Sequence, residues 1–195
     1  MFNKMTHNGS GNVLKVFDHG SETDYLVNPE NVFDMRQADL LIGDVSEVIK
    51  FVKKRHPYSN IVLVHGCNCM NNMGAGLARR IAELYPQAVE ADNLTKKYDE
   101  SKLGTFSHAW IDEQFAVVNL YTQFKYGGVY VNVNYPAVER GFEALIKEYG
   151  GENQDTVFVI PKFIGCGLAG GDYNIIEPIV SKVMTEQSYY LFDNK

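Results

Sequence analysis

The stretch from Ile61 to Leu84 decides the fold, and it reads Ile61-Val-Leu-Val-His65-Gly-Cys-Asn68-Cys-Met-Asn-Asn-Met73-Gly-Ala-Gly76-Leu-Ala-Arg-Arg-Ile-Ala-Glu-Leu84. The apolar run from Ile61 to Val64 predicts a strand that is buried on both faces. A polar loop that contains glycines follows. From Leu77 the apolar residues recur at three- and four-residue spacing, which predicts an amphipathic helix that ends at Pro86.

This order of strand, loop and helix is suited to binding an anion. The first N–H groups of a helix have no partner inside it, and the helix dipole favours negative charge at that end. Gly74 and Gly76 allow a ligand to approach the backbone closely, because they have no Cβ. The loop is not a Walker loop, since G-x-x-x-x-G-K-[ST] occurs nowhere in the chain, and Gly74-Ala-Gly76 lacks the third glycine of a G-x-G-x-x-G fingerprint.

A second glycine-rich loop follows the strand that we predict at residues 156–161. It reads Ile164-Gly-Cys-Gly-Leu-Ala-Gly-Gly-Asp172-Tyr173, and a helix is expected after it. Asn174 and Glu177 have the spacing of a capping box, and Pro178 then falls at the edge of the first helical turn. If Asn174 is the cap, Asp172 is left free in the loop.

The rest of the chain alternates between strands and helices. We expect further strands at 39–43, 104–111, 115–121 and 189–192, and further helices at 44–55, 87–98 and 136–149. Such alternation is typical of a mostly parallel sheet covered on both faces, whose ligands bind at the carboxyl ends of the strands. Residues 1–37 are expected to be an N-terminal extension or edge hairpin, with short strands at 13–17 and 25–27, and residues 38–195 a single domain.

Two polar residues each have two interpretations. Asp44 precedes a predicted helix and lies three residues before Glu47, so it is suited to cap that helix. Alternatively, its carboxylate accepts a hydrogen bond from the amino group of a base. His65 ends the central strand and is either a hydrogen-bonded buried residue or a catalytic group, since its ordinary pKa is close to neutrality.

Composition limits the possible classes of protein. The net charge of −6 argues against an electrostatically driven nucleic-acid binder. No apolar run approaches the roughly 20 residues that span a bilayer, and the first residues lack the apolar region of a signal peptide. The cysteines Cys67, Cys69 and Cys166 have neither the number nor the spacing of a disulfide framework or a zinc site, so we expect reduced thiols in a cytoplasmic protein. Neither a metal nor another cofactor is expected.

Four segments, in this order, together resemble the macro domain family. The first three are Leu41-Ile-Gly-Asp44-Val45, which resembles a G-D-[IV] signature, Val64-His-Gly-Cys-Asn68, which stands where the family often has V-N-A-A-N, and Met73-Gly-Ala-Gly-Leu-Ala78, which resembles G-G-G-V-A. The fourth, from Ile160 to Tyr173, resembles the I-P-x-I-G-x-G-L-x-G-G-x-W loop of the branch that contains ADP-ribose-1''-phosphate phosphatases. The resemblance implies a three-layer α/β/α fold with a mixed, mostly parallel sheet.

The resemblance also implies a ligand, ADP-ribose or ADP-ribose-1''-phosphate. Asp44 would bind the adenine amino group, Val45 would offer a nearby backbone N–H, and Asn68 would contact the distal ribose. The residues implied to surround the ligand, mainly through amides that hold its diphosphate, are Met73, Gly74, Ala75, Gly76, Leu77, Gly165, Cys166, Gly167, Leu168, Ala169 and Gly170.

Three functions are open at this point. The first is hydrolysis of ADP-ribose-1''-phosphate to ADP-ribose and phosphate, with His65, Asn68 and Asp172 as candidate catalytic residues. The second is a module that binds ADP-ribose without chemistry. The third is hydrolysis of ADP-ribosyl esters on modified proteins. The branch with that activity has a lysine and an aspartate where this chain has Gln123 and Ala169, which disfavours the third function.

Overall fold

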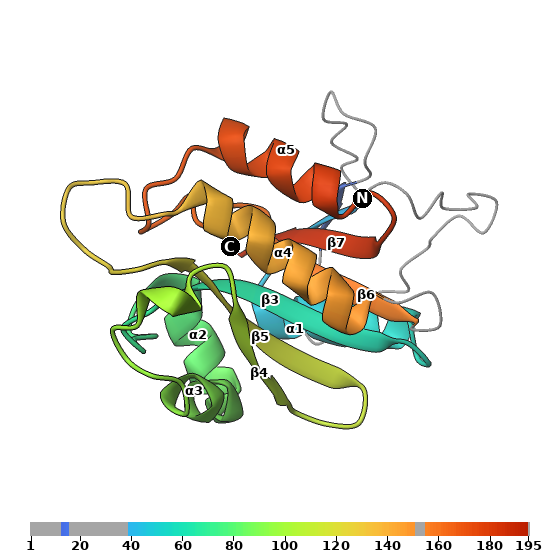
Figure 1. Cartoon of the computed structure of the whole chain (residues 1–195). Helices are drawn as coiled ribbons and strands as arrows, with labels where there is room; N and C mark the ends of the chain where they lie inside the picture. The colour runs from blue at the N-terminus through green and yellow to red at the C-terminus, as the bar shows by residue number, and fades with distance from the viewer. Residues whose placement is uncertain (1–12, 16–38, 151–154, 195) are drawn as a thin grey trace.

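The computed structural model describes residues 13–15, 39–150 and 155–194. Strands from all three ranges form one seven-stranded sheet in the order β1-β2-β7-β6-β3-β5-β4. Every neighbouring pair is parallel except β4 and β5, which are antiparallel (Figure 1). The strands are β1 (Val13–Lys15), β2 (Asp39–Ile42), β3 (Asn60–Asn68), β4 (Phe106–Trp110), β5 (Phe115–Gln123), β6 (Thr156–Pro161) and β7 (Ser188–Asp193).

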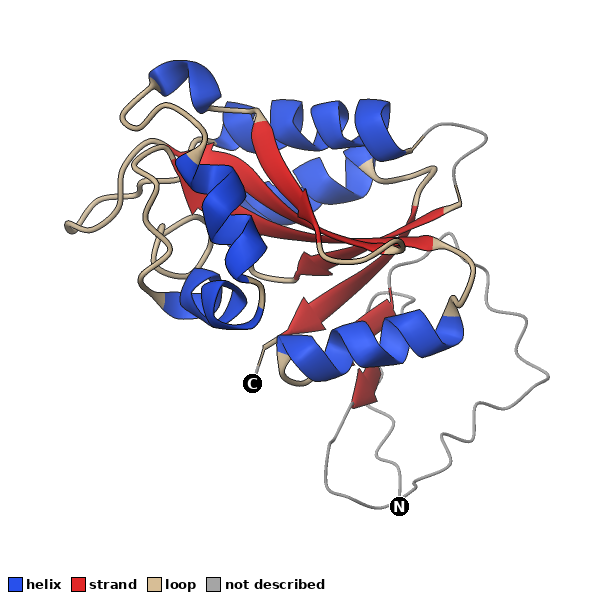
Figure 2. Cartoon of the chain, turned by 90° about the horizontal axis from the view of Figure 1, so that it is seen from below, coloured by secondary structure: helices blue, strands red, loops and turns tan. Residues whose placement is uncertain are grey.

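Helices cover both faces of this sheet (Figures 1 and 2). One face carries α1 (Val45–Arg55), α2 (Gly76–Leu84) and α3 (Pro86–Asn93), and the other carries α4 (Tyr135–Tyr149) and α5 (Tyr173–Val183). A short 3-10 helix, Glu100–Lys102, precedes β4. The three layers and the mixed, mostly parallel sheet confirm the predicted fold class.

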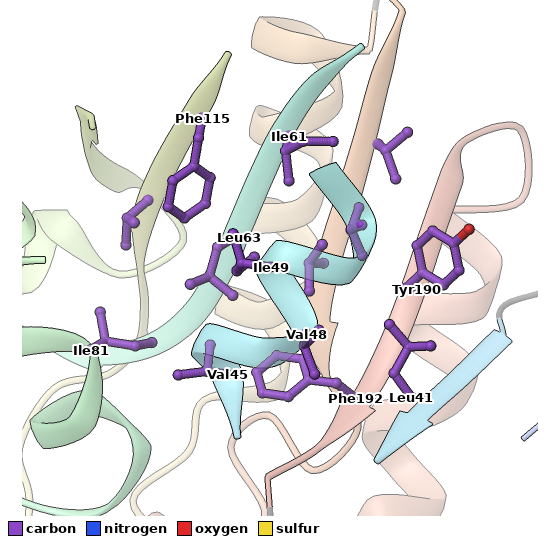
Figure 3. Close-up of a cluster of buried hydrophobic side chains, with 14 of the residues drawn as sticks. Leu41, Val45, Val48, Ile49, Ile61, Leu63, Ile81, Phe115, Tyr190 and Phe192 are labelled. Atoms are coloured by element: carbon purple, nitrogen blue, oxygen red, sulfur yellow. The ribbon is translucent and has the colours of Figure 1, made fainter. Parts of the chain in front are cut away.

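The central strand β3 separates two hydrophobic cores. Ile61 and Leu63 belong to the buried cluster under α1 (Figure 3), whereas Val62 and Val64 belong to the cluster under α4 and α5. Because helices cover both faces, side chains on each face of the strand must be apolar. This is why residues 61–64 form a continuous apolar run rather than an alternating one.

Most of the predicted elements are present. The strands predicted at 39–43, 104–111, 115–121, 156–161 and 189–192 and the helix at 136–149 are β2, β4, β5, β6, β7 and α4, with shifted ends. β1 lies at the edge of the sheet beside β2, and the strand predicted at 25–27 lies outside the described residues. The domain boundary at residue 38 stays a prediction. None of the helices in the described part of the chain is both long and apolar enough to cross a membrane.

The helix predicted at 87–98 is shorter than expected. It is α3, and it ends at Asn93. The side chains of Asn71 and Thr95 each donate a hydrogen bond of 2.6 Å to the carbonyl oxygen of Asp92. The carbonyl oxygens of the last helical turn have no partner inside the helix. Here side chains supply donors to one of them, so the helix can end at Asn93.

Candidate functional site

The first glycine loop joins β3 to α2, and asparagine side chains hold its shape. At the end of β3, the Asn68 amide donates to the carbonyl oxygen of Asn72 at 2.7 Å and accepts from the Met70 N–H at 3.0 Å. Oδ1 of Asn72 accepts from the Gly74 N–H at 2.8 Å. Asn68, implied to contact a ribose, therefore closes the turn with both ends of its amide, and the Gly74 N–H already has an acceptor.

A buried polar cluster supports this loop from beneath. Asn71 has a left-handed backbone with φ of 51°, and its Oδ1 accepts from Nζ of Lys102 at 2.7 Å. The Lys102 side chain is only 7% exposed and its Nζ lies 3.6 Å from Oδ1 of Asp92 and 4.1 Å from the centre of the Tyr121 ring. The Tyr121 hydroxyl donates to the same Asp92 oxygen at 2.8 Å. Burial raises the pKa of Asp92, although Tyr121 and Lys102 oppose this shift.

The second glycine loop runs from the end of β6 to α5. Gly165 has φ of 73°, and a Cβ at this position would lie 2.9 Å from Cγ2 of Val133, so only glycine fits without strain. Asp172 is the N-cap of α5, because its Oδ1 accepts from the Asn174 N–H at 2.9 Å. The prediction that Asn174 caps the helix and leaves Asp172 free is therefore wrong. The helix begins earlier than predicted, which also places Pro178 inside it.

Asp172→Ala is expected to lower the free energy of unfolding by about 0.5–2 kcal/mol, because α5 loses its capping acceptor. Asn174→Ala is the matched control, since the Asn174 side chain donates to Asp172 but caps nothing itself. Urea unfolding followed by circular dichroism measures both changes. Equal losses in the two variants would contradict the assignment of the cap to Asp172.

The two glycine loops meet at the carboxyl ends of β3 and β6, which are neighbouring parallel strands. A Cβ built on Gly76 would lie 3.3 Å from Cδ1 of Leu168, so the start of α2 adjoins the tip of the second loop. Ala75 offers no side-chain cap to α2, and no described residue accepts from the N–H groups of Gly167 and Leu168. Unpaired backbone donors thus lie at adjacent exposed positions, which suits an anion.

The side chains of several other residues implied to surround the ligand pack in the cores or bond within the loop. The side chains of Met73 and Ala169 are buried in the two cores, so only their backbone atoms can face a ligand. Leu77 packs its side chain against the core under α1. The thiol of Cys166 donates to the carbonyl oxygen of Ile164 at 3.6 Å.

Asp44 caps α1 and also pairs with Arg80 of α2. Its Oδ1 accepts from the N–H and hydroxyl of Ser46 at 2.9 and 2.6 Å. Nε and Nη2 of Arg80 donate to Oδ2 and Oδ1 of Asp44 at 2.9 and 3.2 Å. The hydrogen bond from Arg80 is the main reason that the pKa of Asp44 falls to about 2. The neighbouring Val45 N–H donates to Oδ1 of Asn194 at 3.1 Å. The capping interpretation is confirmed, and the contact of Asp44 with a base stays a prediction.

His65 lies in the core rather than at the loops. Its side chain is 1% exposed, and Nε2 is 2.8 Å from Oδ1 of Asn119. Burial lowers the pKa of His65 to about 4, so the ring is neutral at pH 7. This burial and the contact with Asn119 favour the interpretation of His65 as a buried, hydrogen-bonded residue, and its catalytic role stays a prediction.

The cysteines and acidic residues form no further reactive centre within the described ranges. All three cysteines are free, and burial raises the pKa of the Cys67 and Cys69 thiols. No group of three or more His, Cys, Asp or Glu side chains in these ranges is placed to hold a metal ion.

Known proteins share sequence or fold with this chain. No family model matches the chain. An uncharacterized 17.5 kDa protein from the tk-vs intergenic region of enterobacteria phage T4 is 30% identical over 135 residues, which are 67% of this chain and 84% of that protein. This degree of identity and coverage shows that the two proteins are members of one family.

Solved structures share the fold at lower identity. A Bacteroides thetaiotaomicron protein of unknown function has a TM-score of 0.64 and 20% identity, covering 81% of this chain and 99% of its own. A Streptomyces coelicolor macrodomain protein has a TM-score of 0.57 and 17% identity over 80% of this chain and 100% of its own. Thermosipho africanus DarTG, solved with ADP-ribose, has a TM-score of 0.53 and 18% identity over 68% of this chain and 37% of its own.

Proposed function

This chain belongs to the same family as the 17.5 kDa protein of phage T4 and has the macrodomain fold, and from that premise we propose that it binds ADP-ribose. The observation that carries the proposal is the meeting of the two glycine loops, where backbone donors without an acceptor lie side by side. The complex of DarTG with ADP-ribose, a protein of the same fold, supports the choice of ligand.

In the proposed complex, the diphosphate lies between the two loops. The amides at the start of α2 and those of Gly167 and Leu168 donate to its oxygens, and the dipole of α2 favours its negative charge. Backbone N–H groups supply these contacts, so the acidic net charge of the chain does not prevent binding of the diphosphate. The base extends toward Asp44, at the carboxyl end of β2. No metal ion is required for these contacts.

We also propose that ADP-ribose-1''-phosphate is hydrolysed to ADP-ribose and phosphate at this site. The sequence of the second loop supports this reaction, and so does the position of Asp172 at its end. Oδ1 of Asp172 caps α5, whereas no described residue donates to its Oδ2. That oxygen orients the attacking water, and amides of the loops stabilise the charge that grows on the phosphoryl oxygens. The proposal assigns no step to His65 or Asn68, whose side chains hydrogen-bond in the core and in the turn, and their catalytic roles stay predictions.

A second reaction, release of ADP-ribose from modified proteins, has less support. Gln123, which stands where the lysine of that reaction is expected, donates from Nε2 to the carbonyl oxygen of Lys125 at 2.7 Å. It stays a prediction that ADP-ribosylated protein is a partner of this chain. The cytoplasmic location also stays a prediction.

Calorimetric titration is expected to show ADP-ribose binding that is unchanged by EDTA. The protein should release phosphate from ADP-ribose-1''-phosphate, and it should release no ADP-ribose from glutamate-modified protein. Asp172→Asn retains a good helix cap but lacks the carboxylate, so it should bind ADP-ribose and melt like the parent protein while releasing no phosphate. Absence of binding at millimolar ADP-ribose would refute the proposed function. Binding without turnover would leave a module that only binds ADP-ribose.

A further inference from the structure

Asp44 and the N–H of Val45 form one recognition edge, with a hydrogen-bond acceptor beside a donor. This edge is complementary to any group that presents a donor beside an acceptor, as the amino group and ring nitrogen of adenine do. In the structure both positions are already filled by the chain itself. The Arg80 guanidinium donates to the carboxylate, and Oδ1 of Asn194 accepts from the Val45 N–H.

We infer that Arg80 and Asn194 determine specificity at this edge, because they compete with a base for the Asp44 carboxylate and the Val45 N–H. The inference rests on the proposed function, which brings the base of ADP-ribose to Asp44. Arg80 comes from α2 and Asn194 follows β7, so the competing donor and acceptor come from different elements.

The contacts are of a kind that a ligand can break. The side chains of Arg80 and Asp44 are 40% and 33% exposed, so their attraction is screened by water and salt. Asp44 keeps its two contacts with Ser46 when Arg80 leaves, so the cap of α1 survives the exchange. The ion pair thus competes with a base for the carboxylate and lowers the affinity of the base for this edge.

The variant that tests this is Arg80→Met, which removes every donor and retains an apolar side chain of similar length. Its matched control is Arg79→Met, because Arg79 lies one residue earlier and pairs with Glu83 instead of Asp44. In calorimetry, Arg80→Met should bind ADP-ribose about two- to fivefold more tightly than the parent protein, which is the range for loss of one exposed ion pair. Arg79→Met should bind it with the parent affinity.

A change of ligand tests the hydrogen-bond pattern. In the 6-deamino analogue of ADP-ribose, in which unsubstituted purine replaces adenine, a hydrogen atom replaces the amino group, so this ligand keeps the ring-nitrogen acceptor and has no donor for Asp44. Arg80→Met should therefore gain no affinity for the 6-deamino analogue. Asn194→Ala, which frees the Val45 N–H, should gain affinity for ADP-ribose in the same direction. The advantage of Arg80→Met over the parent should shrink as sodium chloride is raised, because salt weakens the ion pair in the parent protein.

The outcomes separate this inference from the function on which it rests. If the parent protein binds ADP-ribose and Arg80→Met binds it equally or more weakly, Arg80 does not compete with the base and the inference is wrong. Equal gains for ADP-ribose and its 6-deamino analogue would also overturn it, since the exchange would then be independent of the amino group. If neither protein binds ADP-ribose, the proposed function fails, and the inference fails with it.

Discussion

Lys102→Met is expected to lower the free energy of unfolding by about 3–5 kcal/mol, which is the range for removing one partner of a buried ion pair. Asp92 is 2% exposed, and without Lys102 its carboxylate is left buried with only neutral partners. Thermal and urea unfolding measure the loss. It should diminish as the pH falls through the raised pKa of Asp92, because a protonated Asp92 has no charge to compensate.

Lys96→Met is the matched control for this prediction. Lys96 lies 3.6 Å from Asp99, but its side chain is 84% exposed, so its loss should change the free energy of unfolding by no more than about 0.5 kcal/mol. A double variant with Asp92→Asn should recover part of the stability that Lys102→Met loses. Small and equal effects of Lys102→Met and Lys96→Met would show that the buried pair contributes nothing.

Gly167→Val is expected to weaken ADP-ribose binding on the order of 100-fold without changing stability. A Cβ at Gly167 would have no heavy atom within 4 Å, so the free protein accommodates the side chain. A phosphate held by this backbone would meet it. Loss of two hydrogen bonds to a charged group, at about 1.5 kcal/mol or more each, corresponds to roughly that change in Kd. Calorimetry gives the affinity, and thermal unfolding gives the stability.

Gly165→Val is the contrasting variant, because it should lower the stability of the fold, which Gly167→Val should leave unchanged. Its left-handed backbone and the short distance from its Cβ position to Val133 both oppose a side chain there. Gly167→Ala should lie between the parent and Gly167→Val in affinity, since the added group is smaller. Parent affinity in a stable Gly167→Val protein would exclude a phosphate close to this part of the loop.

The fold was largely predictable from the sequence because its signals are local. The apolar runs of β3 and β6, the helical spacing in α1 and α4 and the two glycine loops each follow from a few adjacent residues. The register of α5 was harder to predict, because Asp172 and Asn174 are both good caps and their choice depends on the loop before them. In the structure the Asp172 N–H donates to the Tyr135 hydroxyl at 3.0 Å, a contact that no local pattern contains.

The candidate site was less predictable than the fold for the same physical reason. Residue type alone favours a functional role for His65 and Asn68. In the structure, however, His65 contacts Asn119 on β5, the neighbouring strand in the sheet, and Asn68 donates to the carbonyl oxygen of Asn72. The sequence alone does not single out Lys102, since a lysine in a charged segment usually lies in solvent. Its burial depends on Asp92, Asn71 and Tyr121, which are brought together only by the fold.

The position of β7 between β2 and β6 has a consequence for the order in which the site is built. β2 and β3 are consecutive in the chain, yet two strands separate them in the sheet, and β2 reaches the central strands only through β7. A ribosome releases β2 early and β7 much later, and such distant pairings form slowly. The proposed phosphate-binding half of the site lies on β3 and β6, which pair directly, whereas the edge at Asp44 and Val45 joins them only when β7 has paired with both β2 and β6.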